Sequence, residues 1–185
     1  GPGNVLMDHW VQQSLGQSFD DDGQWAAKGQ VIQKLLSSML DDDYFKKAPP
    51  KSTGRDLFNP EWLNHHLTNN DCLNQKPEDI QATLLALTTQ SIAHALKQHA
   101  PKTMSLLICG GGIKNSHLIA QIKNACTWIP QENIQSTAAR GVDPQTVEAG
   151  AFAWLAWAHK RKQPANLPAV TGAKGLRVLG AHYPA

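Results

Sequence analysis

The chain has 185 residues, of which 41% are hydrophobic and 17% are charged. This balance excludes a disordered polar tail, and the length suits a single domain that buries its own core. The formal net charge is +2 at pH 7. The one dense basic run, residues 160–162, follows an apolar segment and is typical of a helix C-terminus, where positive charges favour the helix dipole. The sequence therefore does not indicate a nucleic-acid partner.

Cysteine spacing and hydropathy exclude further classes of protein. The three cysteines, Cys72, Cys109 and Cys126, are odd in number and lack Cys-x-x-Cys spacing, so neither a disulfide framework nor a zinc site is indicated. The longest apolar stretch, residues 149–158, is about half the length of a membrane span, and the N-terminus has no signal pattern. We expect a cytoplasmic protein that does not enter a membrane.

The first half of the chain is predicted to be helical. Apolar periodicity predicts helices at residues 5–15, 24–40, 61–67 and 77–99, and two prolines predict a loop at 44–60. Pro77 and the acidic residues after it begin the longest helix, whose apolar stripe we expect to pack on a sheet. The acidic triplets 20–22 and 41–43 are interpreted as solvated turns, and no metal site is assigned to them.

The second half alternates strands and helices. The sequence predicts a strand at 104–109, a helix at 116–127 and a strand at 133–136, which together form a strand-helix-strand unit of the α/β class. Asp143 as N-cap and Pro144 as first helical residue predict a last long helix over 144–162. A further candidate strand lies at 176–179.

The glycine turn after the first strand is the strongest candidate for a ligand site. Gly110, Gly111 and Gly112 carry no side chains, so a ligand could approach the backbone closely. Asn115 and a helix follow, and the helix N-terminus would offer free N–H groups and a positive dipole end to phosphate. The pattern is neither a dinucleotide fingerprint nor a Gly-Lys-Ser/Thr phosphate loop. A tight strand-to-helix turn without a ligand is the alternative interpretation.

Glu148 is the single charged residue of the apolar segment 147–158. A helix that is apolar on every side is normally buried, and a buried carboxylate needs partners. Glu148 is therefore expected either to cap local N–H groups or to face a polar cleft that holds a ligand. Trp154 and Trp157 are expected in the core or in an interface, and a homodimer is one arrangement that would cover them.

The loop at residues 50–55 combines cations with hydroxyl groups. Lys51, Ser52, Thr53 and Arg55 make a composition suited to binding an anion or bracing a hinge. The eight histidines do not show the same-face spacing of four that helical zinc sites use, so they are interpreted as ordinary surface or core residues.

Five ordered blocks along almost the whole chain resemble the anhydro-N-acetylmuramic acid kinase family. They are Gly1-Pro2-Gly3-Asn4 with Asp8, Pro50-Lys51-Ser52-Thr53-Gly54-Arg55, Cys109-Gly110-Gly111-Gly112 with Asn115, residues 148–156 and residues 166–173. The family belongs to the actin, hexokinase and Hsp70 superfamily, whose members have two ribonuclease-H-like lobes that close on ATP. The resemblance implies that residues 1–185 form one such α/β lobe, the C-terminal nucleotide-binding one, with a mixed sheet flanked by long helices.

The resemblance also implies an activity. In the family, water opens the anhydro bridge of anhydro-N-acetylmuramic acid while the γ-phosphoryl group of ATP passes to the freed sugar hydroxyl, in peptidoglycan recycling. ATP, Mg²⁺ and this sugar are the ligands that the resemblance implies. Glu148 would orient the sugar or water. The glycine turn and Asn115 would hold the nucleotide, and the residues of the cleft or hinge would be Gly1, Pro2, Gly3, Asn4, Lys51, Ser52 and Arg55.

Part of the family's catalytic machinery is expected upstream of Gly1. In the family an Asp-Thr pair directly precedes the Gly-Pro-Gly-Asn block, and that aspartate is the general base. The N-terminal lobe would also precede Gly1, so we expect the chain to be inactive alone. Residues 143–146 depart from the family pattern, which leaves sugar contacts there open. A non-catalytic nucleotide-binding or regulatory module is the alternative function.

Overall fold

The computed structural model describes residues 1–183, which form an α/β protein in which helices predominate. The α-helices are α1 (Val5–Leu15), α2 (Gln33–Leu40), α3 (Asp43–Lys46), α4 (Pro60–Asn69), α5 (Pro77–His99), α6 (Ser116–Ala125), α7 (Val147–Lys160) and α8 (Pro168–Thr171). The strands are β1 (Leu106–Ile108) and β2 (Ile134–Ser136). Short 3₁₀ helices lie at Asp21–Gly23, Ala26–Lys28, Gly111–Lys114, Gln131–Asn133 and Thr137–Arg140.

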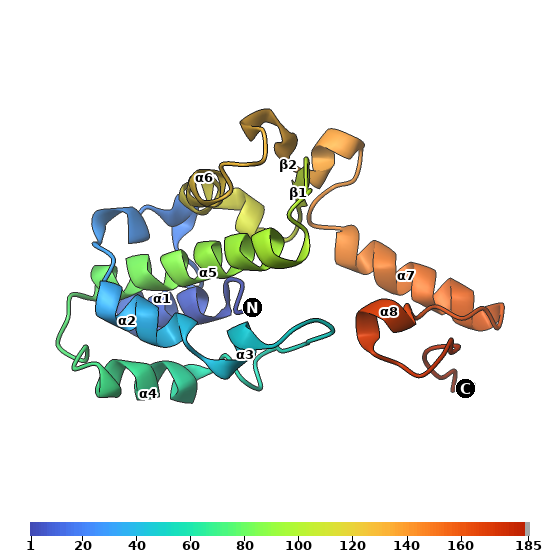
Figure 1. Cartoon of the computed structure of the whole chain (residues 1–185), viewed down its shortest axis with the longest axis horizontal. Coiled ribbons are helices and arrows are strands. Elements are labelled where there is room, and N and C mark those ends of the chain that lie inside the picture. Colours follow the sequence, from blue (N-terminus) through green and yellow to red (C-terminus); the bar gives the residue numbers. More distant parts are fainter. Residues whose placement is uncertain (184–185) are drawn as a thin grey trace.

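The helix α5 is the centre of the fold. Pro77 occupies its first turn together with Glu78 and Asp79, where a missing N–H and negative charges are favourable. Figure 1 shows α1, α2 and α6 around α5, and their buried side chains meet there in one apolar core. The expectation that α5 packs on a sheet is wrong, because its main neighbours among the described residues are helices.

The two strands form a parallel pair. Leu106, Leu107 and Ile108 stand opposite Ile134, Gln135 and Ser136. The strands are joined through α6, so the predicted strand-helix-strand unit is confirmed. Leu106 and Ile108 pack against the core, while Leu107 on the opposite face is exposed. Residues 1–183 contain only this parallel pair of strands, so the sheet described is not the mixed sheet that was expected.

The predicted helix over residues 24–40 is wrong in its first half, where the chain forms a 3₁₀ turn and an extended segment before α2. Gly29 lies so close to α5 that a Cβ there would overlap the Glu78 carbonyl group. The next backbone N–H, from Gln30, donates a hydrogen bond of 2.7 Å to Asp79 Oδ1. This contact with α5 holds the chain at Gly29 in an extended conformation. A continuous helix over residues 24–40 is therefore excluded.

The helix α7 begins later than predicted and is exposed. Asp143 is not its N-cap, because it belongs to a turn in which the Thr146 N–H donates to the Asp143 carbonyl oxygen at 3.0 Å. Only Ala158 of α7 is buried, and Phe152 is 64% exposed. Figure 1 shows α7 leading away from the helices around α5. The expectation of a buried helix is therefore wrong for the part of the chain that the structure describes.

The structure also bears on two smaller expectations. Residues 176–179 do not form a strand. The Arg177 N–H instead donates to Asn166 Oδ1 at 2.6 Å, and the Arg177 carbonyl accepts a hydrogen bond from the Ala165 N–H at 3.1 Å, which ties the segment after α8 to the segment before it. As for the membrane, no helix within residues 1–183 is both long and apolar enough to cross one.

Candidate functional site

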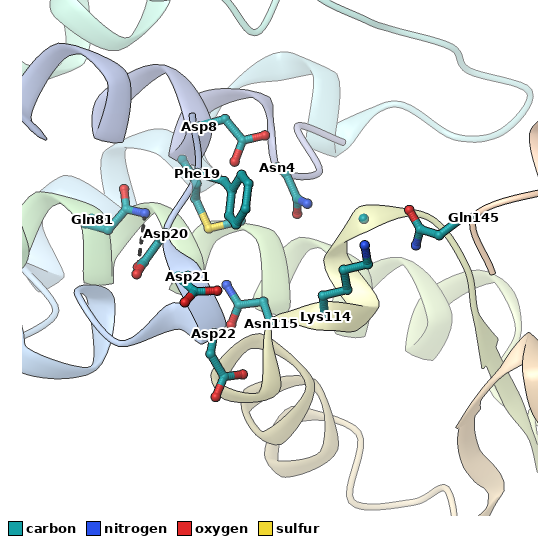
Figure 2. Close-up of a pocket in the computed structure, with 12 residues that line it drawn as sticks. Asn4, Asp8, Phe19, Asp20, Asp21, Asp22, Gln81, Lys114, Asn115 and Gln145 are labelled. Atoms are coloured by element: carbon teal, nitrogen blue, oxygen red, sulfur yellow. Dashed lines mark hydrogen bonds between the residues drawn. The ribbon is translucent and has the colours of Figure 1, made fainter. Parts of the chain in front are cut away.

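A cavity of about 290 Å³ lies where α1, the acidic turn and the glycine turn come together. Figure 2 shows the side chains that line it. They are Asn4, Met7, Asp8, Phe19, Asp20, Asp21, Asp22, Gln81, Gly111, Lys114, Asn115 and Gln145. The set includes three of the predicted site residues, Asn4, Gly111 and Asn115. Asn4 lies at the start of the chain, and the other two lie in the glycine turn and directly after it. The volume is near the lower end of the roughly 300–1,000 Å³ that small-molecule sites occupy.

The glycine turn presents bare backbone to this cavity. A Cβ on Gly111 would meet no atom within 4 Å, whereas a Cβ on Gly112 would lie 3.3 Å from Asn4 Oδ1. Within residues 1–183, the N–H groups of Gly111 and Gly112 donate no hydrogen bond. Gly111 therefore faces open space. Because Gly112 has no side chain, Asn4 at the start of the chain can lie close to the glycine turn.

Gly110 fixes the shape of the turn. Its φ of 80° lies in the left-handed region that favours glycine. Its N–H donates to the Pro144 carbonyl at 2.8 Å, and its carbonyl accepts a hydrogen bond from Gln145 Nε2 at 3.0 Å. Residues 144 and 145 thus hold the glycine turn in place and add a polar group to the cavity.

The N-terminus of α6 is less free than the sequence predicted. Asn115 Oδ1 accepts a hydrogen bond from the Leu118 N–H at 2.8 Å, and Asp22 Oδ1 accepts one from the Ser116 N–H at 2.8 Å. Hydrogen bonds from Ser116 lower the pKa of Asp22 below its ordinary value. Because these side chains already cap the helix, phosphate binding would fall to the glycine turn before it.

The acidic turn at residues 20–22 is not simply a solvated turn. Asp20 is buried and accepts hydrogen bonds of 2.9 Å from the backbone N–H groups of Trp25 and Ala26. Asp22 caps α6, as described above. Asp21 is exposed on the cavity wall. The original interpretation is therefore wrong for Asp20, which organises the chain that follows α1.

Asp8 separates this cavity from a second one of about 350 Å³. Burial raises the pKa of the Asp8 carboxyl above its ordinary value, and the positive charge of Arg55 opposes the rise. Arg55 is exposed and lines the second cavity together with His9. The predicted cation at position 55 therefore faces a pocket, although not the pocket of the glycine turn.

Lys51 has a structural role that the sequence did not distinguish from anion binding. Its ammonium group donates to the carbonyl oxygens of Tyr44 at 3.0 Å and Phe45 at 3.2 Å, and it lies 4.8 Å from the centre of the Tyr44 ring. The Tyr44 hydroxyl in turn lies 3.1 Å from the Gly1 nitrogen. The cluster braces the loop against the start of the chain.

The remaining residues of the predicted cleft are spread out. Pro2 is buried, and the Gly3 carbonyl accepts a hydrogen bond of 2.7 Å from the Thr88 hydroxyl. Ser52 is exposed. Glu148 is exposed in the first turn of α7, and it neither caps that helix nor lines the cavity of the glycine turn. The structure does not bring Glu148 into this site.

Sequence reasoning missed several residues of the cavity wall. They are Met7, Phe19, Asp20, Asp21, Asp22, Gln81, Lys114 and Gln145. One available signal was Gln81, a polar residue between apolar positions of the buried stripe of α5. Another was the aromatic and acidic run at 19–22 directly after α1. The side chains of residues 1–183 form no group of three or more His, Cys, Asp or Glu that could hold a metal ion.

Comparisons with known proteins identify the family. The family model for anhydro-N-acetylmuramic acid kinase matches residues 1–185. A protein of that name from Burkholderia orbicola (strain MC0-3) is 50% identical over 186 residues, covering 100% of this chain and 48% of the relative. Its namesake from Pseudomonas savastanoi pv. phaseolicola (strain 1448A / Race 6) is 50% identical over 185 residues, covering 100% and 50%.

A third protein of the same name, from Chromobacterium violaceum, is 48% identical over 184 residues, covering 100% of this chain and 49% of the relative. The chain thus spans about half the length of the curated relatives it matches. The five blocks noted in the sequence lie within the matched region. On these matches, the chain belongs to the anhydro-N-acetylmuramic acid kinase family.

Proposed function

We propose that this chain is the C-terminal, nucleotide-binding lobe of a kinase that opens the anhydro bridge of anhydro-N-acetylmuramic acid and phosphorylates the sugar with ATP, as part of peptidoglycan recycling in the cytoplasm. The fold would be one ribonuclease-H-like lobe of the actin, hexokinase and Hsp70 type. The names of the relatives support the kinase, and they give no support to a non-catalytic module.

The observation that carries the proposal is the open space over Gly111, since a Cβ there would meet nothing within 4 Å. The N–H groups of Gly111 and Gly112 donate no hydrogen bond within residues 1–183, so they are available to phosphate oxygens. The Lys114 ammonium also has no hydrogen-bond or ion-pair partner within residues 1–183. Together these groups suit the phosphates of a nucleotide.

The described residues fit ATP better than they fit a free metal ion. Residues 1–183 offer no cage of His, Cys, Asp or Glu, whereas Mg²⁺ commonly binds through substrate phosphates with few protein ligands. When bound, Mg²⁺ would neutralise charge on the phosphates. The lobe would supply the backbone donors and Lys114, which position the phosphates, while Pro144 and Gln145 keep the turn in shape.

Titration of MgATP against the chain and its Gly111→Val variant tests the proposal. The valine side chain would fill the open space over the turn, so we expect ATP affinity to fall by at least about tenfold. Gly150→Val is the matched control, because Gly150 also has no neighbour for a Cβ and lies on α7 away from the cavity. Equal affinity in the wild type and the Gly111 variant would remove the glycine turn from the site.

A further inference from the structure

The second cavity, of about 350 Å³, lies between α1 and the start of α4 and shares Asp8 with the nucleotide cavity. Its volume falls within the range of small-molecule sites. Most of its wall that solvent can reach is polar, and the accessible side chains are Val5, Asp8, His9, Gln12, Arg55, Asn59 and Pro60. Apart from Asp8, none of these residues lines the nucleotide cavity.

The two opposite charges of this cavity lack partners. Within residues 1–183, neither the Arg55 guanidinium nor the Asp8 carboxylate forms an ion pair or a side-chain hydrogen bond. The positive charge of Arg55 acts on the Asp8 carboxyl, so the two groups are neighbours that do not pair. Asp8 is also partly buried, and a charge withdrawn from water is more stable with a partner. A ligand that brings an anion to Arg55 and a hydrogen-bond donor to Asp8 would satisfy both groups.

The N-terminus of α4 strengthens the positive end of the cavity. Asn59 is the N-cap of α4, with its Oδ1 accepting a hydrogen bond of 2.8 Å from the Trp62 N–H, and Pro60 is the first helical residue. Asn59 and Pro60 line the same cavity as Arg55, so the positive end of the helix dipole adds to the guanidinium charge. Asp8 repels an anion. An anionic group would therefore lie toward Arg55 and α4, and hydroxyl groups of the same ligand toward Asp8.

Resting on the function proposed above, we propose that the second cavity binds the sugar and that Arg55 is a specificity-determining residue that pairs with the sugar carboxylate. A muramic acid carries a lactyl ether, whose carboxylate is its one charged group at neutral pH, and a guanidinium can donate two parallel hydrogen bonds to a carboxylate. Its ring hydroxyl groups can donate to Asp8. Figure 2 shows Asp8 on α1 at the edge of the nucleotide cavity, so a hydroxyl group held there lies at the boundary between the two cavities. A phosphoryl acceptor needs that position.

Two sugars that differ only in the lactyl group test the inference. They are anhydro-N-acetylmuramic acid and 1,6-anhydro-N-acetylglucosamine, which has a hydroxyl group in place of the lactyl ether. Calorimetric titration uses a chain that also carries the upstream half, with MgADP present so that no phosphoryl transfer occurs. Because Arg55 is exposed, the pair stays partly hydrated, and we expect the wild type to prefer the muramic sugar by about fivefold, less than for a fully buried pair.

Arg55→Met should bring the affinities for the two sugars within about twofold of each other, because it removes the charge and keeps the apolar stem. Arg55→Lys should keep part of the preference, since an ammonium group retains the charge without the planar pair of donors. The matched control is Arg140→Met, which removes an exposed arginine that lines neither cavity and should keep the full preference.

The outcomes separate this inference from the function on which it rests. If the wild type binds MgADP but neither sugar, the proposed sugar kinase function fails. If the wild type binds both sugars equally, or if Arg55→Met keeps the preference, the role of Arg55 is overturned. A loss of ADP affinity in Arg55→Met with the sugar preference unchanged would assign Arg55 to the phosphates and contradict the proposal. The wild-type comparison decides even if a variant does not fold.

Discussion

Asp8 is a carboxylate held where ionisation is unfavourable. It lines both cavities of α1, and burial raises its pKa from the ordinary value of 3.8, against the opposing charge of Arg55. A raised pKa means that the folded chain holds the proton more tightly than the unfolded chain. The stability that Asp8 contributes is thus fully present below the ordinary pKa and is lost as pH rises through the folded-state pKa.

Asp8→Asn should therefore flatten the dependence of stability on pH. We expect the free energy of unfolding of the wild type to fall, relative to that of the variant, as pH rises from about 4 toward neutrality. Urea denaturation across this range measures the difference. Asp21→Asn, which alters an exposed carboxylate of the same cavity, is the control. Parallel curves for the wild type and Asp8→Asn would show that burial of Asp8 has no energetic consequence.

Lys51 offers a second residue-level test, because bracing and anion binding predict different results. Lys51→Met removes the hydrogen bonds to Tyr44 and Phe45 but keeps the apolar stem. We expect a loss of about 1.5–3 kcal/mol in unfolding free energy, the range for hydrogen bonds to charged groups, with ATP affinity unchanged. Thermal unfolding and nucleotide titration on the same preparation distinguish the two roles. A loss of affinity without a loss of stability would restore the anion-binding role.

At the level of elements, local signals predicted some boundaries and long-range contacts overrode others. The sequence predicted the bounds of α1 and α5, because periodicity and the proline start signal of α5 act within one helix. It failed at residues 24–32, where the path depends on the close approach of Gly29 to Glu78, about fifty positions away. The sequence failed again at Asp143, which was predicted as the N-cap of α7. Asp143 instead belongs to the turn that contacts Gly110 through Pro144.

Gly29→Ala tests the contact between this segment and α5. The added Cβ would overlap backbone atoms of Glu78, which cannot move without displacing the start of α5. We expect a loss of at least about 1–3 kcal/mol in unfolding free energy, as for overpacked cores. Gly150→Ala on α7 is the control and should be neutral or stabilising by up to about 1 kcal/mol, because alanine favours helix and no atom obstructs it. Similar effects of the two changes would contradict the close approach.

At the level of the whole molecule, the sequence predicted three residues of the cavity wall, Asn4, Gly111 and Asn115, and missed most of the others. Gly111 and Asn115 were predicted because a strand, three glycines and a helix follow one another directly. Asp20 and Gln81 were not, because they reach the cavity from segments 61 positions apart that only the packing of α5 brings together. The chain also presents α7 largely uncovered, with Phe152 64% exposed, although the helix is apolar.

The last prediction is that residues 1–185 bind ATP but do not phosphorylate sugar. Phosphoryl transfer requires groups on both sides of the transferring phosphoryl, and the unpaired backbone N–H groups and the ammonium group of the described cavity come from the glycine turn and Lys114. The chain covers about half of relatives such as that of Burkholderia orbicola, and the resemblance puts the general base before Gly1. A coupled assay of ADP release with anhydro-N-acetylmuramic acid should therefore detect turnover only for a chain that includes the upstream half.

Gly111→Val in that longer chain should lower turnover at subsaturating ATP, and Gly150→Ala, which adds only a methyl group, should not. Sugar-dependent turnover by residues 1–185 near the rate of the longer chain would show that these residues suffice for catalysis.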